Sequence, residues 1–252
     1  TIIVEDLGTT QNIITNSGQR QNKSDMTLLE STFRIIKSEG VVRSNDITSL
    51  TKKSVLSEKQ VMIEGTIYED IGGLTSKLLG QRVVYFYEKN EGVQKLKYVY
   101  PHDKNSIVTI TSDKICNTSN LKMLNFINDK DKEEKLSIDS NADYIYNSVA
   151  DGNVLNSDMI PKLGQVTLVD NNNDTVFDVV FIENYENVLV KMTNKKDYSV
   201  DTQDSNNISF DSNAIEKTDF YKDGCLASFN SIRTDDVLSI FISRDNSYAK
   251  VI

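Results

Sequence analysis

The chain has 252 residues, of which 28 are basic and 37 acidic, so its formal net charge is −9 at neutral pH. That length suits one large domain or two to three small ones, and the acidic balance argues against a protein built to grip phosphate backbones. One histidine, two cysteines and no tryptophan leave few side chains for catalysis, and no apolar run approaches the roughly 20 residues of a membrane helix.

One segment near the N-terminus carries a helical signal. Ser24 or Asp25 is a suitable N-cap for a helix that presents Leu28 and Leu29. The hydroxyl-bearing and β-branched residues that follow are poor helix formers. The pattern predicts a short helix near residues 25–31 and then a strand over residues 33–42.

Almost all of the remaining sequence alternates between apolar and polar residues, as strands with one buried face do. Strands are predicted over residues 61–68, 82–87, 95–100 and 106–111. With two prolines and eleven glycines in the chain, many turns must be formed by Asn, Asp and Ser, which tolerate a left-handed backbone.

The strands over 82–87 and 95–100 are expected to pair antiparallel, because Gly92 can supply the backbone angle of a short turn between them. Val83, Tyr85 and Tyr87 would then share one face of the hairpin, and Val84 and Phe86 the other. The aromatic residues here, which include Tyr98 and Tyr100, are a candidate stacking surface for bases or sugars. Core packing with cross-strand pairing is the simpler interpretation.

A weak repeat divides the rest of the chain. Three similar entries precede predicted hairpins: Leu79-Gly80-Gln81, Leu163-Gly164-Gln165 and Thr234-Asp235-Asp236. The repeat predicts three small β-modules, over residues 1–112, 113–200 and 201–252. One continuous β-sandwich is the alternative, because hairpins in general resemble one another.

The best candidate site is an acidic loop between two predicted strands. Asp170, Asn172, Asp174 and Asp178 occupy positions 1, 3, 5 and 9 of that loop. Oxygen side chains at alternate positions suit Ca²⁺, which takes six to eight oxygen ligands. Thr175 stands at position 6, where calcium loops carry glycine, and Phe181 stands at position 12 instead of glutamate. An Asx-rich turn without metal is the alternative.

The cysteines and the histidine suggest no catalytic centre. Cys116 and Cys225 lie far apart and form no CxxC motif, which excludes a zinc ribbon. Two half-buried free thiols are expected, and one long-range disulfide remains open. His102 lies in a predicted turn without a second histidine, so we expect an exposed loop side chain.

The acidic loop and its flanking strands, residues 163–185, resemble a module of long extracellular proteins of Firmicutes. These include S-layer-homology surface proteins, and similar modules occur in structural proteins of tailed phages. Residues 142–147, 78–87 and 235–243 resemble further parts of the same module. The family's glycine in the acidic turn is Thr175 here. The resemblance implies a non-enzymatic building block and supplies no catalytic residues.

These observations predict a mainly β protein of two to three barrel- or sandwich-like modules in tandem, with one or two short helices. We expect a structural component of a viral or extracellular assembly, most simply a tailed-phage virion protein of the tail, baseplate or neck. A bacterial surface-layer module and a carbohydrate-binding adhesion module are the alternatives. The expected partners are other subunits of the assembly and further copies of the chain, with no enzymatic activity, nucleic-acid partner or membrane insertion.

Overall fold

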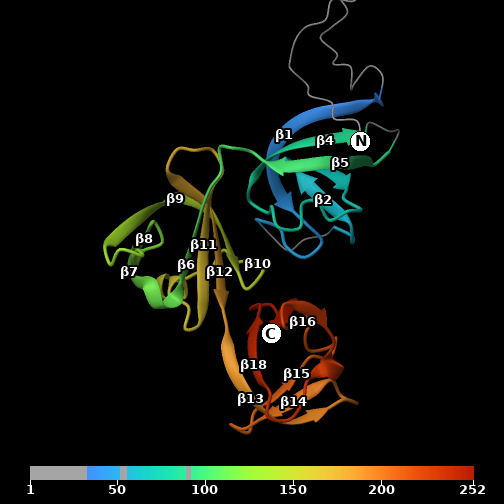
Figure 1. Cartoon of the computed structure of the whole chain (residues 1–252), viewed down its shortest axis with the longest axis vertical. Helices are drawn as coiled ribbons and strands as arrows, with labels where there is room; N and C mark the ends of the chain where they lie inside the picture. The colour runs from blue at the N-terminus through green and yellow to red at the C-terminus, as the bar shows by residue number, and fades with distance from the viewer. Residues whose placement is uncertain (1–32, 52–55, 89–91) are drawn as a thin grey trace, which may run out of the picture.

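The computed structural model describes residues 33–51, 56–88 and 92–252. The named elements in these ranges are strands and three short 3-10 turns, so the mainly β fold class is confirmed. The predicted helix near 25–31 lies outside the described residues. The strands form three separate sheets that follow one another along the chain (Figure 1).

The first sheet is a closed five-stranded barrel. Its strands are β1 (Ile35–Ser44), β2 (Gln60–Ile63), β3 (Thr66–Glu69), β4 (Arg82–Glu88) and β5 (Gln94–Pro101). They are joined in the order β1-β2-β3-β5-β4, and β1 closes the barrel on β4. The β3–β5 pair is parallel and the others are antiparallel. This is the Greek-key arrangement of an OB-type barrel.

The second sheet forms the central lobe. It contains β6 (Ser106–Thr111), β7 (Ile115–Asn120), β8 (Met123–Ile127), β9 (Glu133–Tyr146), β10 (Val149–Ala150), β11 (Gly164–Asp170) and β12 (Val176–Asn184). The order is β6-β11-β12-β9-β8-β7, and β10 pairs with β9. Two 3-10 turns, η1 (Ser112–Lys114) and η2 (Asn156–Met159), connect its strands. Met159 of η2 is fully buried in the core beneath the sheet.

The third sheet forms the C-terminal lobe. It contains β13 (Glu186–Asn194), β14 (Ser199–Thr202), β15 (Asn207–Ser209), β16 (Lys217–Lys222), β17 (Cys225–Ala227), β18 (Val237–Ile242) and β19 (Tyr248–Val251). The order is β15-β14-β13-β18-β19-β16-β17. Phe229, in the 3-10 turn η3 (Phe229–Ser231), packs with Phe210 and Phe220 in its core.

The predicted hairpins are confirmed by the strand pairing. β4 pairs antiparallel with β5, β11 with β12 and β18 with β19. Val83, Tyr85 and Tyr87 all face the interior of the barrel, as the alternation predicted. The described part of the turn between β4 and β5 begins at Gly92, and residues 89–91 lie outside the described residues.

The single strand predicted over 61–68 is wrong. It is a hairpin, β2 and β3, whose two turn residues Glu64 and Gly65 have φ of 45° and 84°. Two successive residues with positive φ make the type I′ turn that suits a two-residue hairpin. The strand predicted over 33–42 is displaced as well, because β1 begins at Ile35 and continues to Ser44.

The chain passes from the first sheet to the second between residues 101 and 106, and from the second to the third between residues 184 and 186. The predicted module boundaries at 112/113 and 200/201 therefore fall after β6 and inside β14, within the second and third sheets. The first boundary is displaced because β6 completes the second sheet by pairing with the distant strand β11. The second falls inside β14, which pairs with its sequence neighbours β13 and β15.

Candidate functional site

The acidic loop between β11 and β12 is organised by the carboxylate of Asp170, whose exposed fraction is 2%. One of its oxygens accepts hydrogen bonds from the backbone N–H groups of Asn172 and Asn173, at 3.0 and 2.7 Å. The other accepts from the N–H of Thr175 at 2.9 Å. The side chain therefore closes the turn by satisfying three backbone donors, as Asx turns do.

The other predicted ligands in this loop also accept loop hydrogen bonds. Asp178 accepts from the N–H of Asn171 at 2.9 Å, and Asp174 accepts from the N–H of Val176 at the same distance. The amide oxygen of Asn172 accepts from the N–H of Asp174. Burial raises the pKa of Asp178, and the neighbouring carboxylates of Asp174 and Asp170 raise it further, against the lowering effect of the Asn171 N–H.

Thr175 adopts the left-handed geometry that the predicted calcium loop requires, with φ of 71°. Its N–H bond to Asp170 holds this conformation, which is unfavourable for a β-branched residue. Among the residues that the structure describes, no three His, Cys, Asp or Glu side chains converge as a metal-binding group. Calcium binding by Asp170, Asn172, Asp174 and Asp178 stays a prediction, and binding would have to compete with the hydrogen bonds just described.

The same loop lies at the junction between the barrel and the central sheet. The buried Asn171 donates its side-chain N–H to the carbonyl of Gly80, at 3.0 Å, and Arg82 donates Nε–H to the carbonyl of Asn171. Gly80 has φ of 79°, and a Cβ there would lie 3.2 Å from a methyl carbon of Val179. Glycine at this position in the Leu-Gly-Gln entry therefore allows the two lobes to approach closely.

An apolar cluster fills the rest of this junction. It contains Val41 and Leu50 from the barrel side and Ile145, Val169 and Val179 from the central sheet. All five are at most 2% exposed. Burial of this kind is the main stabilising contribution in protein interiors, so the barrel and the central sheet share a small core of their own.

Two ionisable groups lie at the polar edge of this junction. Arg43 of β1 approaches Asp143 of β9, with 3.7 Å between Nη1 and Oδ2. Burial raises the pKa of Asp143, the Arg43 charge lowers it, and Asp178 raises it again. The net effect is a pKa above the ordinary value of Asp143, so its charged form is less favourable in the folded protein than in the unfolded chain.

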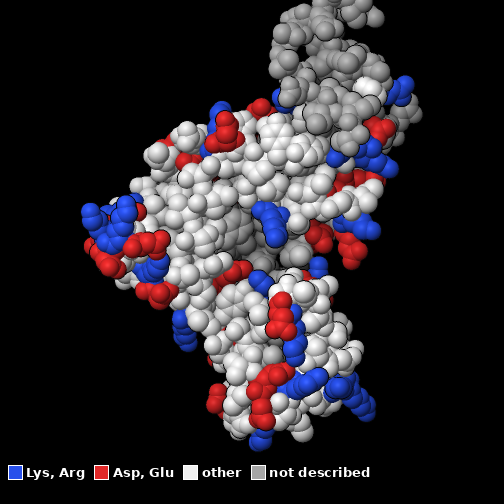
Figure 2. All heavy atoms as spheres, in the orientation of Figure 1, with Lys and Arg blue, Asp and Glu red and all other residues white. Residues whose placement is uncertain are grey.

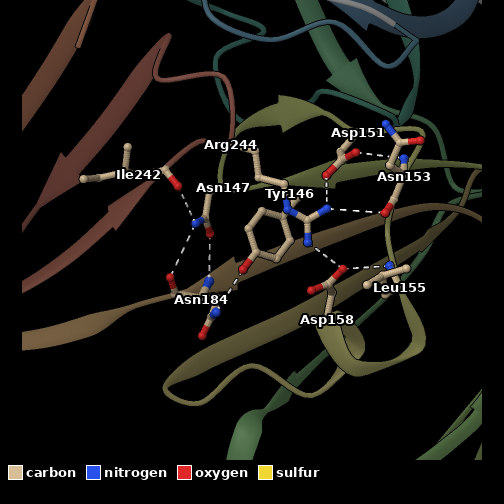
Figure 3. Close-up of polar contacts among 9 residues, drawn as sticks. All are labelled: Tyr146, Asn147, Asp151, Asn153, Leu155, Asp158, Asn184, Ile242 and Arg244. Carbon is tan, nitrogen blue, oxygen red and sulfur yellow. Dashed lines mark hydrogen bonds and ion pairs between the residues drawn. The ribbon is translucent and has the colours of Figure 1, made fainter. Parts of the chain in front are cut away.

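Polar groups connect the central sheet to the C-terminal sheet (Figure 3). Asn147, 3% exposed, occupies the turn between β9 and β10 with φ of 48°. Its side chain donates to the carbonyl of Ile242 in β18 at 2.9 Å and accepts from the N–H of Asn184 at the same distance. One amide therefore joins β9, β12 and β18.

Arg244, which follows β18, reaches back across the same junction (Figure 3). Its guanidinium pairs with Asp151 and, at 2.6 Å, with Asp158. It also lies over the ring of Tyr146, 4.4 Å from the centroid. Asp158 additionally accepts from the N–H of Leu155 and so caps η2. Hydrogen bonding to Asp158, with the charges of Asp158 and Asp151, raises the pKa of Arg244 above its ordinary value.

The aromatic residues predicted as a stacking surface lie on both faces of the barrel sheet, some inside the barrel and some outside. Tyr85 and Tyr87 stack inside the barrel, against Tyr68 of β3. Tyr98 and Tyr100 lie on the outer face and are 58% and 37% exposed. Together with the partly exposed Phe86 they form a row, with ring centroids 6.3 Å (Phe86–Tyr98) and 5.7 Å (Tyr98–Tyr100) apart. We call this row the aromatic face.

The predictions for the cysteines and the histidine are partly wrong. Cys116 and Cys225 are free thiols, as expected, but both are exposed. His102 lies in the turn between β5 and β6, yet its side chain is only 14% exposed, with its ring nitrogens 3.5 Å from Glu39 and 2.6 Å from Asp103. Both errors concern burial, which depends on neighbours that are distant in sequence.

Two surface features complete the description. On the face shown in Figure 2, acidic and basic side chains are interspersed around the periphery. A groove of about 580 Å³ lies beside the junction between the central sheet and the C-terminal sheet. Its lining includes Leu163, Tyr185 and Ile252. Among the described residues, none forms a helix long and apolar enough to cross a membrane.

Sequence reasoning identified the acidic loop but missed Asn147 and Arg244. Asn and Ser both favour turns, so Asn147-Ser148 was a detectable turn signal, but nothing local indicated the partner strand β18. No protein-family model matches the chain, and no curated protein matches it.

Proposed function

We propose that this chain is a non-enzymatic structural subunit of a large assembly, most simply of a tailed-phage virion (tail, baseplate or neck). The observation that carries the proposal is the coupling of three successive sheets by side-chain contacts. An apolar cluster joins the first two, and Asn147 and Arg244 join the second and third. A subunit that must hold its neighbours at a set geometry needs lobes that do not rotate freely.

Domains move relative to one another by default unless a large apolar interface couples them. The first junction has a buried apolar cluster, and at the second Tyr185 packs on the buried Phe241. Here the side chains at both junctions are buried or tied in several directions, as for Asn171 and Asn147. The resemblance of residues 163–185 to surface-layer and phage modules supports the same role. A bacterial surface-layer module is the alternative assembly, because a rigid tandem of β-lobes would serve it equally.

Locating the chain in its source tests the proposal. An antibody raised against the full chain is used on purified phage particles, on cell-envelope fractions and on cytosol from the same culture. Enrichment in particles, at a constant ratio to a capsid protein through a density gradient, supports the virion. Enrichment in the envelope fraction supports the surface layer, and a chain confined to cytosol overturns both.

The aromatic face supports a second candidate function, carbohydrate binding. An adhesion module requires an exposed aromatic platform, and Phe86, Tyr98 and Tyr100 provide one on the outer wall of an OB-type barrel. OB-type barrels bind oligosaccharides and oligonucleotides. The net charge of −9 favours an uncharged glycan over a polyanion.

Binding to purified cell-wall polysaccharide tests this second function. We expect the double variant Tyr98→Ala/Tyr100→Ala to lose retention on the polysaccharide. The matched control is Tyr198→Ala, because Tyr198 is 48% exposed but lies in the C-terminal lobe. Equal retention of the parent and both variants, or no retention of the parent, would remove the aromatic face as a glycan site.

A further inference from the structure

The central sheet has one regularly paired open edge, the strand β6. It pairs with β11 alone, over six consecutive residue pairs without a bulge. Its sequence, Ser-Ile-Val-Thr-Ile-Thr, contains no charge, glycine or proline. A regular, uncharged edge with unpaired backbone groups is a template for another strand.

The other open edges among the described strands are protected. β15 and β17 have three residues each, and β10 has two. β7 is longer, but its pairing with β8 shifts register twice. Short strands and bulges are the usual means by which sheet edges avoid pairing with other chains. Only β6, among these edges, lacks such protection.

We propose that β6 pairs antiparallel with β6 of a second copy of this chain, across a two-fold axis at Thr109. The inference rests on the proposed structural role and names the contact through which subunits associate. A two-fold axis perpendicular to the sheet keeps the same face of each copy on the same side. Residues opposite one another must then share a face, and this restricts the possible registers.

The register centred on Thr109 matches the two faces of β6. Val108 and Ile110, which face the core, lie opposite each other, and the exposed Ile107 lies opposite the exposed Thr111. Moving the axis to Val108 would place Ser106 opposite Ile110 on the inner face. Cross-strand pairs of β-branched residues and Thr–Thr pairs are favourable, so the first register is preferred.

A second copy suits this edge better than a charged partner strand. Pairing about a two-fold axis sets β6 against the same sequence, and a strand without charges then meets no like charge. Thr109 already bonds to Thr167 of β11, hydroxyl to hydroxyl at 3.0 Å. The dimer would extend this row of threonines across the axis to the second copy.

Sedimentation equilibrium of the full chain over a range of concentrations tests the pairing. We expect a reversible dimer in the parent and roughly tenfold weaker association in Thr109→Lys, because two lysines would then face each other across the axis. The matched control is Met192→Lys on β13, since Met192 is 55% exposed on another sheet. The control should associate as the parent does.

Disulfide trapping supplies a second readout that does not depend on Thr109→Lys folding. In a Cys116→Ser/Cys225→Ser background, Thr109→Cys should oxidise to a covalent dimer, because the two Cβ atoms lie opposite each other. Ile107→Cys should not, because four residues separate it from its own copy along the strand. Equal crosslinking of both variants would overturn the register.

A parent that stays monomeric at every concentration, or a dimer that Thr109→Lys leaves intact, would overturn the proposal. If the parent is monomeric and Thr109→Lys is also excluded from particles, β6 pairs with a strand of a different protein instead. The location of the chain in particle or envelope fractions is measured separately, so failure of the dimer and failure of the structural role are distinguishable.

Discussion

The two junctions of this protein are built differently. The barrel meets the central sheet through buried aliphatic side chains and a glycine, and the acidic loop adds hydrogen bonds to backbone carbonyls. The central sheet meets the C-terminal sheet mainly through polar groups, one buried amide and an arginine held by two carboxylates, with Tyr185 packed on the buried Phe241 beside them. Apolar burial is non-directional and is not screened by salt, whereas hydrogen bonds depend on direction and ion pairs are screened. The first junction should therefore tolerate local change better than the second.

The largest effect is expected from Asn147→Ala. Loss of the amide leaves the Ile242 carbonyl and the Asn184 N–H without their partner, and alanine disfavours the φ of 48°. We expect about 2–4 kcal/mol lower unfolding free energy in a urea titration. Ser148→Ala is the control, because Ser148 has φ of 68° in the same turn. An equal loss in both variants would show that backbone strain, and not the amide, is decisive.

Gly80→Ala probes the packing of the first junction. Alanine at this position must adopt φ of 79°, and its Cβ would lie 3.2 Å from a methyl carbon of Val179. We expect a loss of about 1–2 kcal/mol from the backbone alone, and a further loss from the contact. Gly65→Ala isolates the backbone part, because Gly65 has φ of 84° and open space around its Cα. A Gly80→Ala loss no larger than that of Gly65→Ala would mean that the lobes yield at this contact.

Arg244→Met sharpens the comparison at the second junction. Methionine keeps an apolar side chain over Tyr146 and removes the pairs with Asp151 and Asp158. Because Arg244 is 40% exposed, we expect only about 1 kcal/mol, and the difference from the parent should shrink in high salt. Faster hydrogen exchange in η2 and β18 would localise the effect. Lys114→Met, which removes the exposed pair with Asp129, should leave the melting temperature unchanged.

Asp143→Asn tests the pH dependence of the first junction. The folded pKa of Asp143 is raised by burial, so protonation stabilises the folded state and this contribution is lost as pH rises through that pKa. We expect the variant to melt above the parent at neutral pH. The advantage should vanish below the ordinary pKa of 3.8. A variant that melts below the parent at neutral pH would show that the Arg43 pair outweighs the desolvation of Asp143.

The smallest expected effect is that of calcium on the acidic loop. At a calcium concentration equal to the dissociation constant, one site adds about 0.4 kcal/mol by mass action. We expect a small rise in the melting temperature of the parent between EDTA and millimolar Ca²⁺, and none in Asp174→Ala. Equal responses of the two proteins would leave an Asx turn closed by Asp170.

Local patterns in the sequence predicted much of the strand structure. Period-two alternation identified β4, β5 and β6, and assigned Val83, Tyr85 and Tyr87 to one face, because side-chain direction in a strand is a local property. The same alternation continued through Glu64-Gly65 and concealed a turn, since two residues with positive φ preserve the pattern on either side. The acidic loop was likewise recognised from spacing alone.

The tertiary structure decided which strands share a sheet and which polar groups are buried. β6 joins β11, more than fifty residues later, and this moved the sheet boundary ahead of residue 112. Asn147 and Arg244 became junction residues only because β18 passes beside the turn of β9 and β10. The division of the tyrosines between the interior of the barrel and the aromatic face followed from closure of β1 on β4. Strand direction is encoded residue by residue, whereas pairing between distant segments depends on the free energy of the whole fold.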